Sequence, residues 1–381
     1  MKQATKAVHA GTVLDKASKG VNSPIYTSTA HTFIDEDECA YPRYYNTKGQ
    51  EIVCNKISAL EQTEASLLFS SGLAATSSAF LGLLKEGDHV VSQGNIYGGS
   101  RYFMEHELPR FGISVSFTDE ESNEAFEQLV QPNTRLIYVE SPSNPLLKVI
   151  DLAFIAQLAQ NNDAWSMVDA TFATPINIQA HLLGIDVVMH SGTKYLGGHS
   201  DIIFGTLSSS QELINRIHHA AVNYGGNVNG ATCGLIERSL KTLAVRVKQH
   251  NKNAGYLAEK LTVCSFVDQV YYPGLNSHPS HRIAAEQMQG FGGMLSFEIN
   301  LNKTQITQFM KELKLILPAI SLGGVESLMG CPRISSHAKV SAQTREKLGI
   351  KDNLMRFSVG IEDADDLFQD IKQAYEKAIA S

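Results

Sequence analysis

The stretch VVMHSGTKYLGGHS occupies residues 187–200 and combines a strand signal with a reactive side chain. The apolar run 187–189 predicts a buried strand, which ends at the hydroxyl residues Ser191 and Thr193. Lys194 follows, and a lysine at the end of a core strand is costly unless a partner or a reaction uses it. The neighbouring hydroxyls suit an anion such as phosphate. We interpret Lys194 as a candidate for a Schiff base with a phosphorylated aldehyde, against the plainer alternative of a solvated lysine.

The sequence around this stretch, from residue 67 to residue 205, alternates short apolar strands with amphipathic helices. This alternation is typical of an α/β fold in which helices cover both faces of a mostly parallel sheet. Ligands in such sheets bind where the strands end and the loops begin. The expected strands are 66–69, 89–92, 114–117, 136–140, 166–169, 187–190 and 202–207.

The rest of the chain predicts two further parts. Residues 1–50 are polar and rich in turn residues and tyrosines, so we expect an arm that lies on another surface, such as a second subunit. A helical run at about 231–261 then leads from a large domain, residues 51–250, to a smaller α+β domain, residues 251–381. In that smaller domain we expect strands at 267–271, 294–299 and 354–359 and helices at 303–315 and 364–378.

Composition excludes several classes of protein. The 381 residues are 43% hydrophobic and 19% charged, as in ordinary globular proteins, and the formal charge of -7 argues against a nucleic-acid or anionic-membrane partner. No apolar run is long enough to span a bilayer. The five cysteines are scattered without a CxxC pair, which indicates neither a disulfide framework nor a metal site. We expect a cytoplasmic protein.

Three more loops follow expected strands. Residues 70–75 pass through small residues into a helix, whose N-terminal amides suit a phosphate, although a tight turn gives the same pattern. Tyr97 precedes two glycines, which predicts an aromatic face beside a ligand or simply a packed turn. Asp169 ends an apolar strand, where it either caps the next helix or keeps a pyridine nitrogen protonated. Together with Lys194 these loops favour a pyridoxal 5'-phosphate (PLP) site.

Ordered motifs along almost the whole chain resemble the cystathionine and methionine lyase and synthase family of PLP-dependent enzymes. The motifs are SSGLA at 70–74, YGG at 97–99, ESPSNP at 140–145, VDATFATP at 168–175, SGTKY at 191–195, GHSD at 198–201, YPGL at 272–275, GFGGMLSF at 290–297, SLGGVESL at 321–328 and RFSVGIE at 356–362. The resemblance implies the fold of the PLP-dependent transferases (fold type I), with a mostly parallel seven-stranded sheet in the large domain. It also implies a homo-oligomer, a dimer at least and commonly a dimer of dimers.

The resemblance assigns roles by position. Lys194 is the Schiff-base lysine, Asp169 pairs with the pyridine nitrogen, and Tyr97 stacks on the ring and handles the leaving-group proton. The remaining residues hold the cofactor or the substrate. The phosphate is bound by the amides of Gly72 and Leu73 and the hydroxyls of Ser191 and Thr193, and Thr171 lines the ring. The phosphate of the neighbouring subunit is reached by Tyr41 and Arg43. The substrate carboxylate is bound by Arg356, with Asn144 and Ser321.

The implied reaction is the elimination of a sulfur leaving group from L-cystathionine, at the β or the γ carbon. Cystathionine γ-lyases and γ-synthases usually carry a glutamate where this chain has Ile320, and methionine lyases usually carry a cysteine where it has Gly99. Ala170 replaces the usual asparagine after the ring aspartate. The alternatives are therefore cystathionine γ-synthase, methionine γ-lyase and, in another class, a PLP-binding protein without catalysis. An aminotransferase or decarboxylase of the same fold is disfavoured by the sulfur-family motifs.

Overall fold

The computed structural model describes residues 1–34, 37–120, 122–334 and 349–380, which form two compact units. Unit 1 comprises residues 1–140, 151–197 and 201–244. Unit 2 comprises residues 141–150, 198–200 and 245–381. Each unit has a β-sheet and a hydrophobic core of its own.

Unit 1 is organised around a seven-stranded sheet in the order β1-β7-β6-β5-β4-β2-β3. Strand β7 is antiparallel to both of its neighbours, β1 and β6, and the other six strands run in one direction. The expected mostly parallel α/β sheet is confirmed. Its strands are β1 (Ala65–Phe69), β2 (His89–Ser92), β3 (Ser114–Phe117), β4 (Thr134–Glu140), β5 (Trp165–Asp169), β6 (Val187–His190) and β7 (Gly205–Ser209).

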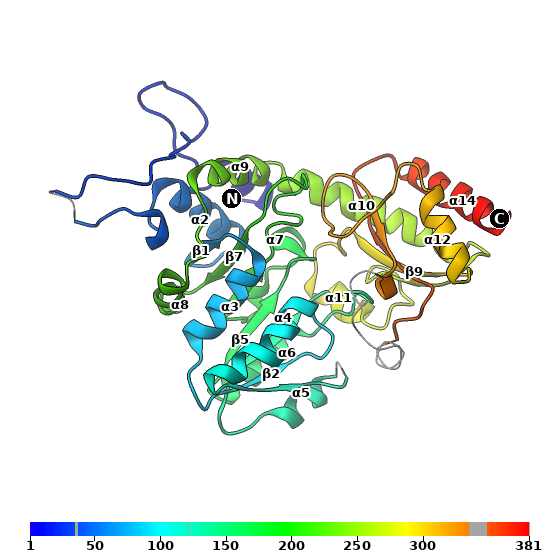
Figure 1. The fold of residues 1–381 in the computed structure, drawn as a ribbon, viewed down its shortest axis with the longest axis horizontal. Helices are drawn as coiled ribbons and strands as arrows, with labels where there is room; N and C mark the ends of the chain where they lie inside the picture. Colours follow the sequence, from blue (N-terminus) through cyan, green and yellow to red (C-terminus); the bar gives the residue numbers. More distant parts are fainter. Residues whose placement is uncertain (35–36, 121, 335–348, 381) are drawn as a thin grey trace. The chain divides into compact units, whose positions relative to one another are not determined.

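Helices cover both faces of this sheet because the strands are apolar on both sides. On one face, Phe69, Tyr138 and Met167 pack against helices α3 (Gly72–Leu83) and α8 (Gln211–Tyr224), which lie side by side in Figure 1. The opposite face carries helices α2 and α6. The remaining helices of this part of the chain are α1 (Gln3–His9), α2 (Lys48–Glu61), α4 (Gly98–Tyr102), α5 (Asn123–Leu129), α6 (Leu152–Asn161), α7 (Thr174–Asn177) and α9 (Gly230–Leu240).

The last strand of the large sheet begins three residues later than the sequence predicts. The predicted strand is 202–207, whereas β7 starts at Gly205. The residue before it, Phe204, is engaged elsewhere: its N–H donates to the Thr193 hydroxyl at 3.1 Å and its carbonyl accepts from the Thr193 N–H at 3.1 Å. The apolar segment therefore supports the turn that carries Lys194 before it enters the sheet.

The predicted N-terminal arm begins with a segment that packs against the rest of unit 1. Helix α1 buries Ala7 against α2, and the buried ammonium of Lys56 donates to the Ala7 carbonyl (3.2 Å), the Val8 carbonyl (3.3 Å) and the Thr12 hydroxyl (3.2 Å). These carbonyls belong to the end of α1, where a cation is favourable. Farther along, residues 21–34 expose several large apolar side chains, Val21, Ile25, Phe33 and Ile34.

Lys56 predicts a pH dependence of stability. Burial lowers the pKa of Lys56 to about 8, below its ordinary value, which is kept in the unfolded chain. Between about pH 8 and pH 10.5 the unfolded chain therefore binds more protons than the folded chain, and stability rises with pH in that window. We expect the free energy of unfolding of the wild type, measured by urea denaturation relative to Lys56→Met, to increase from pH 8 to pH 10. A difference that stays flat or falls would contradict this placement.

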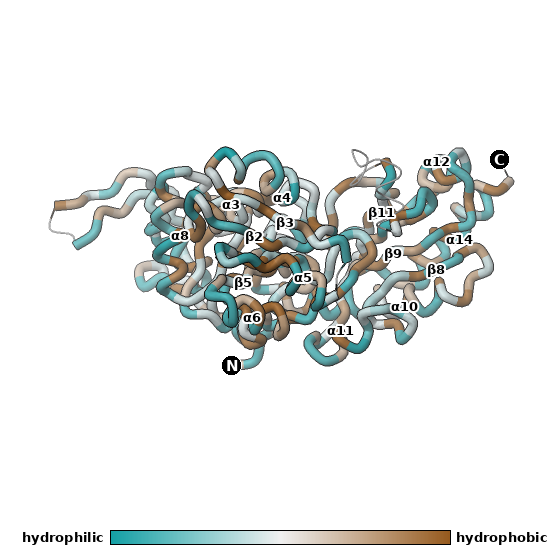
Figure 2. Tube along the Cα trace, turned by 90° about the horizontal axis from the view of Figure 1, so that it is seen from below, coloured by the Kyte–Doolittle hydropathy of each residue, from teal (hydrophilic) through white to brown (hydrophobic). Residues whose placement is uncertain are grey.

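Unit 2 contains a five-stranded sheet in the order β10-β11-β12-β9-β8, with β10 and β11 parallel and the other pairs antiparallel. Helices α12 (Lys303–Glu312) and α14 (Ala364–Ala380) pack side by side (Figure 1), and hydrophobic residues run along β9 (Figure 2). The strands are β8 (Val267–Tyr271), β9 (Met294–Ile299), β10 (Leu317–Pro318), β11 (Leu328–Gly330) and β12 (Leu354–Ser358), and α11 spans His281–Gln287.

The expected single helical run at 231–261 is two helices, α9 and α10 (Leu243–Thr262). The interruption falls at Lys241 and Thr242, where the Thr242 hydroxyl donates to the Ser239 carbonyl at 3.1 Å. Such a local bond competes with the regular helical pattern.

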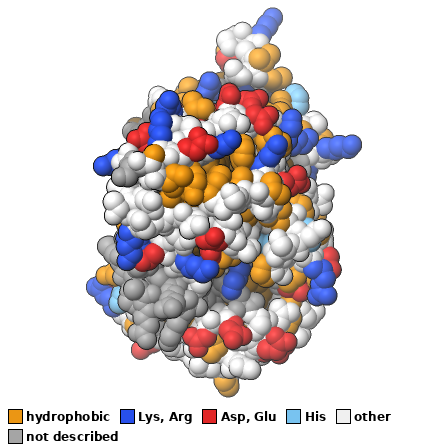
Figure 3. All heavy atoms as spheres, turned by 90° about the vertical axis from the view of Figure 1, so that its right-hand side faces the viewer, with side chains coloured by type: hydrophobic (Ala, Val, Ile, Leu, Met, Phe, Trp, Pro, Cys, Tyr) orange, Lys and Arg blue, Asp and Glu red, His pale blue; other side chains and the backbone are white. Residues whose placement is uncertain are grey.

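No helix in the described ranges is long and apolar enough to cross a membrane. Lysine and arginine side chains are interspersed with acidic ones over the face shown in Figure 3.

Candidate cofactor and substrate sites

Asp169 ends β5 and is held by the loop that follows it. Its Oδ1 accepts hydrogen bonds from the Thr171 N–H at 3.0 Å and from the Thr171 hydroxyl at 2.5 Å. Burial raises the pKa of the Asp169 carboxyl, and the two bonds from Thr171 and the charges of His190 and Lys194 partly offset this rise. A buried carboxylate in this position is best stabilised by a further cation, and a protonated pyridine nitrogen is one.

The end of the neighbouring strand, β6, is hydrogen-bonded to the Thr171 hydroxyl through Ser191. The Ser191 N–H donates to the Thr171 Oγ1 at 2.8 Å, and the Lys194 N–H donates to the Ser191 carbonyl at 3.2 Å, which closes the turn. Burial raises the pKa of the Asp169 carboxyl, and Lys194 is one of the groups whose charge opposes this rise. Asp169, Thr171, Ser191 and Lys194 therefore lie together at the carboxyl ends of β5 and β6, as the sequence predicts for a cofactor site.

A cradle of small groups lies next to this cluster. Helix α3 starts at Gly72 with Ser71 as its N-cap, whose hydroxyl accepts from the Ala74 N–H at 3.0 Å. The Gly72 and Leu73 amides are thus first-turn amides, which a helix leaves available to an anion. A Cβ atom on Gly72 would lie 2.8 Å from the Cβ of Ser191, so the Ser191 side chain sits directly against the helix start. These groups fit a phosphate.

The cradle gives a direct prediction for Gly72→Ala. The added methyl group would overlap Ser191, so that either the serine or the start of α3 must shift, and we expect the affinity for PLP to fall roughly tenfold or more. Gly255→Ala in α10 is the matched control, because a Cβ there meets only the Tyr272 ring at ordinary distances of 3.8–3.9 Å. Titration of each apo-protein with PLP measures the effect. Equal affinities would contradict the cradle.

Thr193 is placed differently from its expected role. Its hydroxyl lies within 3.2 Å of the Phe204 carbonyl and accepts from the Phe204 N–H. In this arrangement the hydroxyl braces the lysine turn. Phosphate binding by Thr193 therefore requires its hydroxyl proton to turn away from the Phe204 carbonyl.

Tyr97 is presented by a second buried acid. The Tyr97 N–H donates to Glu140 Oε2 at 2.7 Å, and the Glu140 N–H donates to the Gln93 side-chain carbonyl at 2.9 Å. Glu140 ends β4 and pairs in register with Asp169, so the two carboxyls follow adjacent strands. Glu140 has no role predicted from the sequence, although the pattern that indicates Asp169, an acid at the end of an apolar strand, also applies to it.

The phenol ring of Tyr97 is half exposed and packs on Gly99. A Cβ atom on Gly99 would lie 2.5 Å from Tyr97 Cε1. A larger residue at position 99 would therefore displace the ring.

The expected carboxylate-binding group lies in unit 2. Arg356 Nη1 donates to Asn144 Oδ1 at 3.3 Å and Arg356 Nη2 donates to the Ser321 carbonyl at 3.1 Å. Read alone, Arg356 would be a surface residue at a strand end, but it lies inside β12 and is only 8% exposed. The structure thus brings all three expected residues together, with Ser321 contributing its carbonyl.

The expected cross-subunit pair lies in a short 3-10 turn, Pro42–Tyr44. Arg43 Nη1 donates to the Val222 carbonyl at 2.9 Å, and the guanidinium lies over the rings of Tyr44 (5.1 Å) and Tyr41 (5.9 Å). Aromatic stacking of this kind holds an arginine in place while its outer N–H groups stay available.

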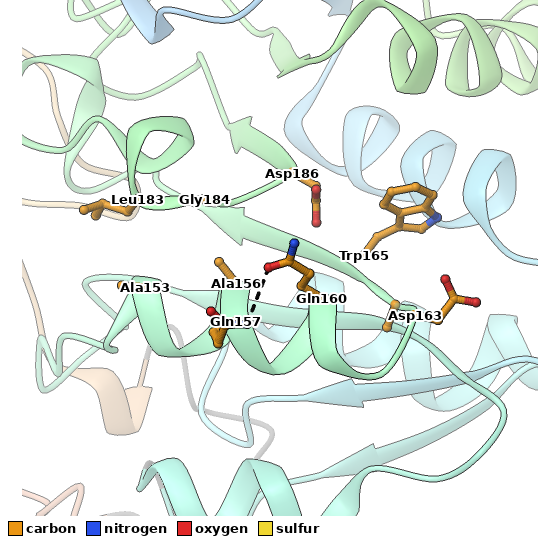
Figure 4. Close-up of a pocket in the computed structure, with 10 residues that line it drawn as sticks. Ala153, Ala156, Gln157, Gln160, Asp163, Trp165, Leu183, Gly184 and Asp186 are labelled. Carbon is orange, nitrogen blue, oxygen red and sulfur yellow. Dashed lines mark hydrogen bonds between the residues drawn. The ribbon is translucent and has the colours of Figure 1, made fainter.

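A cavity of about 630 Å³ opens at the other end of β5 (Figure 4). Trp165 and Asp186 line it together with Gln157 and Gln160 of α6. Trp165 begins strand β5 and Asp169 ends it, so this cavity lies roughly 13 Å along the strand from Asp169. It is therefore a separate feature. Among the described residues no cluster of His, Cys, Asp and Glu is arranged to hold a metal ion.

This architecture, with a lysine, an aspartate and the first-turn amides of α3 beside one another at the carboxyl edge of a mostly parallel sheet, is that of a PLP-dependent enzyme of fold type I. Residues 4–376 match the family described as Cys/Met metabolism PLP-dependent enzyme, and the chain belongs to that family. The expected family and cofactor are confirmed.

Several relatives match over nearly their whole length. A cystathionine beta-lyase of Lactococcus lactis subsp. cremoris is 41% identical over 98% of both chains. A cystathionine gamma-lyase of Bacillus subtilis is 40% identical over 99% of this chain and all of its own. The crystal structure of a cystathionine gamma-lyase from Lactobacillus plantarum complexed with L-serine superimposes with a TM-score of 0.94 at 34% identity and covers 100% of both chains.

Proposed function

We propose that this protein is a carbon–sulfur lyase that eliminates sulfur from L-cystathionine, at either the β or the γ carbon. The observation that carries the proposal is the joined cluster of Lys194, Thr171 and Asp169 at the ends of β5 and β6. The names of the relatives support the substrate class. β-Elimination gives homocysteine, pyruvate and ammonia, and γ-elimination gives cysteine, 2-oxobutyrate and ammonia, with one water consumed in each case.

The residues divide the work. PLP, when bound, withdraws electrons from the α carbon of the substrate and so makes its proton removable. In our proposal Asp169 holds the ring nitrogen, and Thr171 fixes Asp169. The phosphate is held by the amides of Gly72 and Leu73 and by the hydroxyls of Ser191 and Thr193. Lys194 Nζ anchors the cofactor and takes the α-proton. Tyr97 covers the ring and handles the proton of the leaving group.

Arg356 is proposed to bind the substrate carboxylate. Its two outer nitrogens already meet carbonyl oxygens of Asn144 and Ser321, which fix the plane of the guanidinium. A planar guanidinium held in this way suits a bidentate contact with a carboxylate.

Two positions bear on the choice of substrate. Ile320 is 78% exposed. Unlike the glutamate that is usual at this position in cystathionine γ-lyases and γ-synthases, it offers no charge to the distal amino group of the substrate. A cysteine at position 99, as is typical of methionine lyases, would displace the Tyr97 ring from its place on Gly99. Cystathionine γ-synthase and methionine γ-lyase are the alternatives, and relatives of both kinds match the chain. A PLP-binding protein without catalysis would not need a substrate clamp such as Arg356.

A comparison of substrates tests the proposal. The holoenzyme is incubated with L-cystathionine, with L-methionine, and with an O-acyl-homoserine plus cysteine, and the initial rates are compared at equal concentration. We expect the highest rate of thiol release with L-cystathionine. Release of methanethiol as the fastest reaction, or formation of cystathionine, would replace the proposal by the corresponding alternative.

We further propose that the protein works as a cytoplasmic homo-oligomer, a dimer at least and by family habit a dimer of dimers, in which Tyr41 and Arg43 reach the phosphate of the neighbouring subunit. Two observations support this proposal: the guanidinium of Arg43 stacks on the Tyr44 ring, and residues 21–34 expose large apolar side chains. Patches of this kind on a protein surface mark interaction sites.

Mixing two inactive variants tests the shared site. In a mixed dimer of Arg43→Ala and Arg356→Ala, one site receives Arg43 from one chain and Arg356 from the other and is intact. We expect each variant alone to be weakly active and the mixture to recover a substantial fraction of wild-type activity. Confirmed mixed dimers without recovery would show that Arg43 does not act across the interface.

A further inference from the structure

A buried acid and a buried histidine lie behind the cofactor cluster, and the roles given above do not use them. Glu61 ends α2 and His190 ends β6, and both side chains are 1% exposed. His190 Nε2 lies 2.5 Å from Glu61 Oε1, which is a short hydrogen bond. The two residues are 129 positions apart in the sequence, so the fold brings them together.

The position of Glu61 is unfavourable for a lone carboxylate. The C-terminus of the 14-residue helix α2 carries the negative end of the helix dipole, and burial removes the solvent that would stabilise the charge. A buried carboxylate needs a hydrogen-bond donor in contact, and His190 Nε2 is that contact. Within the described residues, Glu61 Oε2 and His190 Nδ1 have no other hydrogen-bond partner, so the two groups depend on each other.

His190 is connected to the cofactor cluster by one peptide bond. The N–H of the next residue, Ser191, donates to Thr171 Oγ1 at 2.8 Å, and Thr171 Oγ1 donates to Asp169 Oδ1 at 2.5 Å. Any shift at the end of β6 therefore moves the hydroxyl that orients Asp169. The positive charge of His190 also lowers the pKa of the buried Asp169 carboxyl, against the rise that burial causes.

We propose that Glu61 and His190 form a positioning pair for the cofactor: the bond from Glu61 fixes the His190 side chain at the end of β6, and His190 in turn orients Asp169 toward the PLP ring nitrogen. Neither residue touches the cofactor in this proposal. This positioning role depends on the binding of PLP, which the family uses, and not on the identity of the sulfur substrate. Loss of the pair weakens the hold of Asp169 on PLP even when the protein remains folded.

The main test is Glu61→Gln, which keeps the shape and an acceptor for His190 Nε2 but removes the charge. We expect the dissociation constant for PLP, measured by titrating the apo-protein, to rise about tenfold, with a changed visible circular dichroism band at saturating PLP. The melting temperature of the apo-protein should change little. Glu286→Gln is the matched control, because it removes the same charge from an exposed pair with Arg282, and it should bind PLP as the wild type does.

The double variant Glu61→Gln/His190→Gln separates charge from packing. Two amides restore a neutral hydrogen bond, so a merely structural pair would regain both its melting temperature and its affinity for PLP. We expect the melting temperature to stay near that of the wild type while PLP still binds about tenfold more weakly. Wild-type PLP affinity and dichroism in the double variant, or in Glu61→Gln should the double variant not fold, would overturn the proposal.

Discussion

Lys194→Ala is expected to lose the visible absorbance band of bound PLP and to cleave L-cystathionine at least about 10³-fold more slowly than the wild type. Lys194 is proposed both to anchor the cofactor and to take the α-proton, and a positioned acid–base group alone contributes about 10²–10⁴-fold. The substitution removes both functions but leaves the backbone bond from Lys194 N–H to the Ser191 carbonyl. Absorbance spectra before and after borohydride treatment, together with initial rates, measure the effect.

Lys303→Ala is the control for this experiment. Lys303 makes an exposed ion pair with Asp352 in unit 2, at 3.0 Å, and its loss should leave both the spectrum and the rate unchanged. A visible band that persists in Lys194→Ala with full activity would place the cofactor lysine elsewhere in the chain.

Asp169→Asn is expected to lower the rate of cystathionine cleavage by about 10²-fold or more and to weaken PLP binding. The asparagine keeps an oxygen for the Thr171 N–H and hydroxyl, so the loop holds its shape, but the negative charge that keeps the ring nitrogen protonated is gone. Because Asp169 is buried, no nearby solvent replaces that charge. Rates at saturating PLP separate the loss of chemistry from the loss of binding.

Asp186→Asn provides the comparison. Asp186 also holds a neighbouring strand, accepting from the Ser166 N–H and hydroxyl at 2.8 Å, but at the opposite edge of the sheet. We expect a cost in stability without a change in the PLP spectrum. Equal losses of activity in the two variants would mean that Asp169 acts only through the fold.

Local sequence patterns locate the strand ends at which Asp169 and Lys194 lie. Asp169 and the lysine turn follow apolar strands, and the structure joins them through Thr171. Period and polarity locate a strand end to within a residue or two, and a parallel sheet gathers such ends at one edge. The same reasoning places the Gly72 amides, because a strand followed by small residues and a helix has few other backbone paths.

The features that the sequence does not predict depend on long-range packing. Lys56 holds α1 from 44 residues or more away, and Glu61 meets His190 across 129 residues, so no local pattern marks either contact. Arg356 is buried because Asn144 and Ser321 supply its acceptors, which neither period nor composition reveals. Gly205 starts β7 late because Phe204 is bound to Thr193.

The products formed from L-cystathionine decide whether Lys194 and Asp169 serve a PLP-dependent carbon–sulfur lyase. The wild-type holoenzyme is incubated with L-cystathionine, and the keto acid, thiol and ammonia are quantified together. We predict one keto acid, one thiol and one ammonia per substrate consumed, with pyruvate and homocysteine for β-elimination or 2-oxobutyrate and cysteine for γ-elimination. Substrate left intact by protein that carries its full complement of PLP would mean that the protein is not a cystathionine lyase.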